Sequence, residues 1–185
     1  KVLLFTLGFI SIHYAQDQTT LLKKQAQQIF TNVETINIRK ETGIPKSIKG
    51  QLGTNVNLSD ENQVKNVFTK AAVLFKMNVS KDNFTRKSIF TDKEGMTHLK
   101  LQQEYLGVPV YGSEMILHTT KSNELKQING RFTPELTMDV NPVISKDQAL
   151  SIALDDLGNV KYRWEDEQEE KILKEVFKDN TKSWK

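Results

Sequence analysis

Histidine is the side chain in this sequence best suited to metal binding or proton transfer, and it occurs three times, as His13, His98 and His118. If the strands flanking "YLGVPVYG" form a symmetric hairpin, His98 lies across from His118 and Tyr105 across from Tyr111. Zinc sites use three or four protein ligands, and the pattern places no carboxylate beside the pair. We therefore interpret both imidazoles as half-exposed sheet residues. A small metal-binding enzyme using His98 and His118 is the least favoured alternative.

Other signatures of catalysis are missing from the sequence. It has no His-Glu-x-x-His, Gly-x-Ser-x-Gly, phosphate-binding glycine loop or dinucleotide fingerprint. Without cysteine, disulfides, thiolate zinc sites and thiol nucleophiles are excluded. The acidic run at residues 165–170 lacks the alternating ligands and central glycine of a calcium loop, so we interpret it as a solvated turn. We expect no catalytic, cofactor-binding or metal-binding residue, and hence a function based on binding.

Composition favours a soluble globular chain of one domain or two small ones. Its 185 residues are 37% hydrophobic and 26% charged, with a formal net charge of +3. The basic residues form no aromatic-interleaved strip of the kind that binds nucleic acid. Lys1, the apolar run at residues 2–12 and Ala15 resemble a secretory signal peptide, assigned to residues 1–15. This run is too short for a membrane-spanning helix, which needs about 20 apolar residues.

A helix followed by strands is the pattern expected after residue 58. Ser59 is the expected N-cap of an amphipathic helix that ends near Asn78. The apolar stripe of this helix is Val64, Val67, Phe68, Ala71, Ala72, Leu74 and Phe75. Period-two alternation then predicts antiparallel strands in "THLKLQQEY", "PVYGSEMILHTT" and "LKQINGRFT". One face of the first strand holds Leu99, Leu101, Gln103 and Tyr105. A helix on one face of such a meander is an α+β architecture, and residues 59–133 form this domain.

Two further segments flank this domain, and a second unit follows it. Residues 16–58, polar and rich in turn signals, are expected to be an irregular leader arm, and residues 134–142 a linker. In residues 143–185, Ser145 and Gln148 predict a capping box, and Gly158 ends the helix. Strands are expected in "VKYRW" and "KILKEVF". The second unit would repeat the order of helix and strands, with its sheet incomplete.

The stretch from residue 92 to residue 132 contains a charged-glycine turn, a strand with Gln and Tyr, "GVPV", a glycine, another strand and a closing "NG". The residues of this pattern are Gly95, His98, Gln103, Tyr105, Gly107, Val108, Pro109, Val110, Gly112, Asn129 and Gly130. With this pattern the stretch resembles the fungalysin/thermolysin propeptide (FTP) domain. "PVISKDQALSIAL" is similar to the start of a PepSY domain, which follows the FTP domain in such precursors.

The signature residues have physical roles in a hairpin. Gly107 can adopt the positive φ of a tight reversal, and Pro109 fixes φ at a strand start. Gly112 allows a bulge or the close approach of another backbone. For Gln103 and Tyr105, sheet packing with a satisfied polar tip and direct contact with a partner both stay open.

The resemblance implies two successive cystatin-like units, the second truncated, in the pro-region of a secreted thermolysin-type zinc metallopeptidase. Such a pro-region would act in cis as intramolecular chaperone and inhibitor of the catalytic domain. This fragment would be no enzyme and hold no cofactor. Zinc, with calcium as a further candidate, would belong to the catalytic domain downstream. The alternative is a free-standing secreted protease inhibitor or binding module of cystatin-like fold.

Overall fold

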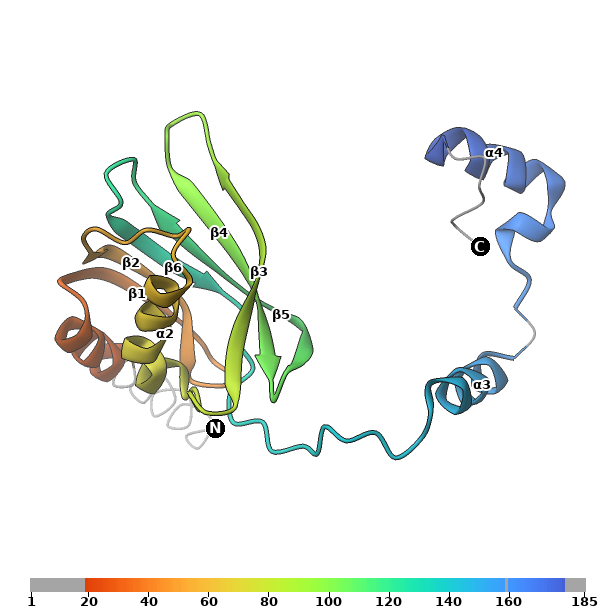
Figure 1. Ribbon diagram of the computed structural model, residues 1–185, viewed down its shortest axis with the longest axis horizontal. Helices are drawn as coiled ribbons and strands as arrows, with labels where there is room; N and C mark the ends of the chain where they lie inside the picture. Colours follow the sequence, from red (N-terminus) through yellow and green to blue (C-terminus); the bar gives the residue numbers. More distant parts are fainter. Residues whose placement is uncertain (1–18, 159, 179–185) are drawn as a thin grey trace, which may run out of the picture. The chain divides into compact units, whose positions relative to one another are not determined.

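The computed structural model describes residues 19–158 and 160–178 of the chain. The chain divides between residues 140 and 141 into two compact units, a boundary inside the segment expected as a linker. The sheet and helix α2 (Glu61–Phe75) belong to the first unit, and helices α3 (Lys146–Leu157) and α4 (Glu167–Phe177) to the second (Figure 1). The signal peptide expected at residues 1–15 lies outside the described residues.

The first unit contains an open six-stranded sheet in the order β1-β2-β6-β5-β4-β3. All neighbouring strands are antiparallel. The strands are β1 (Asn32–Arg39), β2 (Ile44–Gly53), β3 (Asp82–Thr91), β4 (Thr97–Tyr105), β5 (Val108–Thr119) and β6 (Leu125–Gly130). The predicted meander is present as β4, β5 and β6. Strand β3, at one edge of the sheet, was not predicted.

Residues 19–58 are not the irregular arm that the sequence suggested. They comprise a helix at 19–29 and the hairpin of β1 and β2, and β2 pairs with β6 through Ile48 and Ile128. Two register shifts in β1 interrupt its period-two pattern. Gly50, which resembles a turn signal, lies within β2 with φ of +149°, where a Cβ atom would collide with Asn32 O and Glu34 N. The glycine allows close approach of two strands instead of ending one.

Helix α2 covers one face of the sheet (Figure 1). Asp60, not the predicted Ser59, is its N-cap, because the Asp60 side chain accepts hydrogen bonds from the backbone N–H groups of Asn62 and Gln63. The helix ends at Phe75, three residues earlier than expected, with Lys76 in the left-handed conformation. Its buried residues are Val64, Val67, Phe68, Ala71, Leu74 and Phe75, as predicted except for Ala72.

The two faces of the sheet differ in chemistry. Alternate residues of β4, Leu99, Leu101, Gln103 and Tyr105, are buried, which confirms the predicted face. Leu117 of β5, Ile128 of β6 and Ala26 of the helix at 19–29 join the same core as α2. Residues that alternate with these, including His98 and His118, lie on the opposite face. We call this opposite face of the sheet the outer face.

In the second unit, α3 forms with the predicted capping box between Ser145 and Gln148 and with Gly158 as its C-cap. The strands expected after it are wrong for the described residues. "KILKEVF" lies in α4, and the supposed acidic turn is the start of that helix, with Asp166 as its N-cap. "VKYRW" contains only the start of the 3₁₀ turn η1 (Arg163–Glu165). Ile172 and Val176 are four residues apart, which is a helical spacing. The interpretation of this segment as an alternating strand overlooked that spacing.

The fold is therefore mixed α+β, with the sheet in the first unit. The described residues of the second unit form helices and no sheet, so a second cystatin-like unit stays a prediction.

Candidate functional site

The hairpin of β4 and β5 reverses through Leu106 and Gly107. Tyr105 pairs with Val108, and the two residues between them have φ of +49° and +82°. Positive φ at both central residues is the mark of a type I′ turn, which matches the twist of the flanking strands. Gly107 therefore takes the positive φ expected of it. Leu106 takes one too, which is unfavourable for a bulky side chain. Its backbone N–H donates to Lys81 O at 2.8 Å, which helps hold it there.

A large bulge in β5 separates this turn from the rest of the hairpin. Glu104 pairs with Pro109 but Gln102 pairs with Glu114, so residues 110–113 of β5 lie opposite Gln103 alone. The prediction that Tyr105 faces Tyr111 is therefore wrong. The side chain of Tyr111 is instead fully exposed, at 103%.

Gly112 and Gln102 shape the bulge. Gly112 has φ of +73°, and a Cβ atom there would meet nothing within 4 Å, so it serves the bulge and not a close approach. Gln102 Nε2 donates to Val110 O at 2.7 Å and to Ser113 O at 3.0 Å. Sequence reasoning missed Gln102. It is the residue whose side chain holds the bulge closed.

Gln103 is a structural residue. Its side chain is completely buried, with Oε1 accepting from Thr133 N at 2.8 Å and Nε2 donating to Thr133 O at 2.9 Å and to Asp82 Oδ1 at 3.3 Å. Tyr105 is also buried, at 4% exposure. Both side chains are packed inside the sheet, and the polar tip of Gln103 is satisfied there.

Two signature residues, His98 and Asn129, belong to a chain of side chains on the outer face. His98 Nδ1 and His118 Nδ1 are 2.6 Å apart, since the two residues pair in register as predicted. His98 Nε2 is 2.7 Å from Asp92 Oδ2, and His118 Nε2 is 2.6 Å from Asn129 Oδ1. The expectation that no carboxylate converges on the pair is wrong, because Asp92 does.

The Asp92 carboxylate links this chain to the β3–β4 turn. Its other oxygen, Oδ1, accepts from Met96 N at 2.8 Å, in a turn where Gly95 has φ of +82°. The hydrogen bond from His98 lowers the pKa of Asp92 below its usual value. Burial lowers the pKa of His118, and the nearby His98 and Lys49 add to that effect. These shifts favour an ionised carboxylate and a neutral His118.

Gly130, next to Asn129, allows a close approach between β6 and β5. Its φ is +135°, and a Cβ atom there would collide with Glu114 O and lie 2.8 Å from Met115 Cα. Glu114 itself bridges Lys87 and Lys100 on the outer face, at 2.5 and 2.6 Å. Hydrogen bonds from these two ammonium groups lower the pKa of Glu114.

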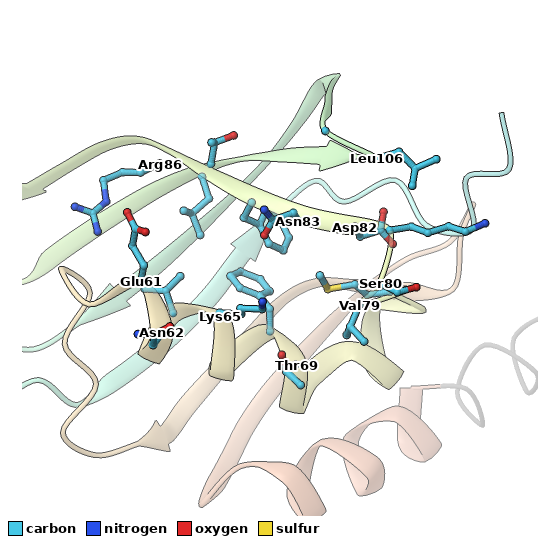
Figure 2. Close-up of a pocket in the computed structure, with 18 of the residues that line it drawn as sticks. Glu61, Asn62, Lys65, Thr69, Val79, Ser80, Asp82, Asn83, Arg86 and Leu106 are labelled. Carbon is cyan, nitrogen blue, oxygen red and sulfur yellow. The ribbon is translucent and has the colours of Figure 1, made fainter. Parts of the chain in front are cut away.

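A cleft of about 670 Å³ lies between α2 and the edge strand β3. Figure 2 shows Glu61, Asn62, Lys65 and Thr69 on the helix side, and Asp82, Asn83 and Arg86 on the strand side. Arg86 Nη2 also donates to Ser59 O at 3.0 Å. The lining has both charge signs, and neither His98 nor His118 belongs to it.

Among the described residues, no three His, Asp or Glu side chains are grouped so that they could hold a metal ion. Within the same residues, no helix has both the length and the apolar content needed to cross a bilayer.

Comparison with known proteins gives a partial match. Residues 82–132 match the family described as Fungalysin/Thermolysin Propeptide Motif. The chain is 29% identical over 120 residues to "Zinc metalloproteinase MspA" of Legionella longbeachae. This alignment covers 57% of this chain and 22% of that protein. It is 30% identical over 121 residues to "Bacillolysin" of Bacillus cereus, covering 62% of this chain and 21% of that protein.

"Thermolysin" of Alicyclobacillus acidocaldarius is 35% identical over 72 residues, 37% of this chain and 13% of that protein. The chain thus aligns with about a fifth or less of the length of these relatives. No solved structure matches significantly. The matched family segment runs from β3 through β6 to Phe132 and contains all eleven signature residues.

Proposed function

We propose that this chain is the N-terminal pro-region of a secreted thermolysin-type zinc metalloendopeptidase precursor. The observation that carries the proposal is the match of residues 82–132 to a propeptide motif, together with relatives that include a zinc metalloproteinase. The chain would act as intramolecular chaperone and inhibitor of the catalytic domain in cis. Zinc, with calcium as a further candidate, would be bound by that domain and not by this chain.

Binding, without chemistry, suffices for this mechanism. A pro-region that binds only the folded protease stabilises it by mass action. The covalent link gives a high effective concentration, which cleavage removes. Residues 1–15 would direct secretion, and residues 143–185 would be the start of a PepSY-like domain.

The turn and bulge of the hairpin provide the surface we propose for contact with the protease. Gln103 and Tyr105 are buried, whereas Leu106 and Val108 are about half exposed and Tyr111 is fully exposed. Exposed apolar and aromatic side chains on a rigid support are typical anchors of protein interfaces. Leu106 also adopts a strained backbone conformation that Asn or Gly would fit better. Neither its exposure nor its φ benefits the free chain, which supports a role in binding.

Inhibition tests the proposal. The chain is titrated against the protease domain encoded downstream, with mature bacillolysin as a second target and peptide hydrolysis as the readout. We expect saturable inhibition that is relieved when the chain is digested. No inhibition, and no help in refolding the protease, would overturn the proposal.

Leu106→Asn separates binding from folding in this assay. It removes the apolar side chain but suits the type I′ turn, so we expect inhibition to weaken at unchanged or higher thermal stability. Lys121→Ala, at an exposed turn position, is the matched control and should leave inhibition intact.

The reading frame after Lys185 distinguishes the alternative. A zinc-peptidase motif there supports the pro-region. A stop codon soon after the second unit would favour a free-standing inhibitor of cystatin-like fold.

A further inference from the structure

Four side chains form a continuous chain across the outer face of the sheet. Asp92 comes from the β3–β4 turn, His98 from β4, His118 from β5 and Asn129 from β6. All three contacts between them are 2.6 to 2.7 Å long. All four residues are half-buried, and the Asp92 and His98 side chains are 25% and 16% exposed. Water therefore has limited access to the link between the rings.

Counting hydrogen-bond donors and acceptors determines how many protons the two imidazole rings hold. The Asp92 carboxylate can only accept, so His98 Nε2 carries a proton. The Asn129 carbonyl oxygen also only accepts, so His118 Nε2 carries a second one. The two Nδ1 atoms then face each other at 2.6 Å, and that contact requires a third proton between them. Three protons on two imidazoles mean one imidazolium and one neutral ring.

The surroundings place the positive charge at His98. Asp92 is an acceptor for His98, and the Phe90 ring stacks on His98 with centroids 4.9 Å apart, an arrangement that favours a cation. His118 is farther from the Asp92 carboxylate, and the positive charge of Lys49 on β2 disfavours a second positive charge on this ring. Burial lowers the pKa of His118, which agrees with a neutral ring there.

We infer that His98 and His118 share one proton and form an acid-sensitive latch that ties the β3–β4 turn to β6 across the outer face. In acid the pair would gain one more proton, so that both Nδ1 atoms would carry N–H groups. Both rings would then be positively charged, with their centroids 4.8 Å apart. The link between the rings would then break.

The effect on stability has a definite sign. A neutral His118 is favoured in the folded chain, so the unfolded chain binds more protons as pH falls. The contribution of the neutral His118 to stability is fully present above the ordinary histidine pKa of 6.5 and is lost as pH falls through the lowered pKa of folded His118. The proton that the folded pair retains acts in the opposite direction at higher pH, so the stability of the pair should be greatest between its two titration steps. Acid should thus loosen the outer face of the hairpin.

Side-chain nitrogen NMR of the full chain tests the shared proton directly. The two imidazoles should titrate in two separate steps, as strongly coupled sites do. Near pH 7, one ring should be an imidazolium and the other neutral. The His13→Gln variant removes the third imidazole signal and so simplifies assignment. Two neutral rings at pH 7, with Asn129 turned to donate its amide hydrogen, or two independent titrations with one midpoint, would overturn the inference.

Thermal unfolding between pH 5 and pH 8 tests the latch. The unfolding midpoint of the wild-type chain should fall by about 3 °C or more below pH 6.5, and that of His98→Gln/His118→Gln should stay nearly constant. The control is Gln127→Ala, because Gln127 pairs with His118 but takes no part in the chain of four residues. It should keep the wild-type pH profile, and the same profile in the double variant would refute the latch.

The consequence for proteolysis rests on the proposed function. Inhibition by the wild-type chain should weaken in acid, and inhibition by the double variant should depend less on pH. If the chain inhibits at no pH, the proposed function fails while the NMR and unfolding results still decide the latch. If inhibition occurs with the same pH dependence in both chains, only the regulatory role fails.

Discussion

The Gln103 side chain pairs with the backbone of Thr133 as a neighbouring strand would. Its carbonyl oxygen accepts from Thr133 N at 2.8 Å and its amide nitrogen donates to Thr133 O at 2.9 Å. The Ser113 and Thr133 hydroxyls add a contact of 2.6 Å. One buried amide thus fixes the segment that leaves the sheet after β6, beside the bulge that displays Tyr111.

Gln103→Leu should destabilise the chain by about 2 to 3 kcal/mol, because it leaves partly buried backbone groups of Thr133 without partners. Chemical denaturation measures the change. Gln51→Leu is the control at an exposed strand position and should shift the free energy of unfolding by about 0.5 kcal/mol or less. Equal effects would show that the Gln103 amide is not structural.

Gly130→Ala should be much more damaging than Gly112→Ala. Both glycines have positive φ, but only at Gly130 would the new methyl group collide with backbone, at Glu114 and Met115. We expect a loss of roughly 3 kcal/mol or more at Gly130, from strain plus overpacking, and about 1 kcal/mol at Gly112. Similar denaturation midpoints for the two variants would contradict the close approach at β6.

Gly107→Val should lower stability by about 1 to 2 kcal/mol, since a β-branched residue is strained at φ of +82°. No atom lies within 4 Å of the added Cβ position, so the cost is in the backbone. Thermal unfolding should show little change for Lys121→Ala. If Gly107→Val and Lys121→Ala have the same unfolding temperature, the assignment of the type I′ turn is wrong.

Glu114→Gln should change the acid sensitivity of the chain. The pKa of Glu114 is lowered by hydrogen bonds from Lys100 and Lys87, so its stabilising contribution is present above the ordinary glutamate pKa of 4.5 and is lost as pH falls through the lowered pKa. The unfolding temperature of the variant should be below that of the wild type at pH 6, and the two should converge once pH falls below the lowered pKa of Glu114.

Added salt should narrow that difference at pH 6, because both lysines are partly exposed and their charges are screened. Glu94→Gln, at an exposed position of the β3–β4 turn, removes the same charge, and Glu94 makes no ion pair within the described part of the chain. A pH profile of Glu114→Gln that matches that of Glu94→Gln would argue against the pairing.

Local patterns were enough to predict several elements. The apolar spacing after residue 58 predicted α2, and Ser145 with Gln148 predicted the capping box of α3, because neighbours within a few residues determine such elements. The tight turn at Gly107 and the pairing of His98 with His118 also followed from the sequence, as did the resemblance to a propeptide.

Other features depend on residues far apart in the chain. The pairing of β2 with β6 could not be seen locally, since bulges and Gly50 hide the strand pattern. The bulge at residues 110–113 displaced Tyr111 from Tyr105, and only folding brought Asp92 and Asn129 to the two histidines. The sequence by itself determined the helices with clear caps, the hairpin turn and the family resemblance. The tertiary structure decided sheet membership, strand register and the hydrogen-bonded chain on the outer face, because these arise from long-range contacts that local residue patterns do not encode.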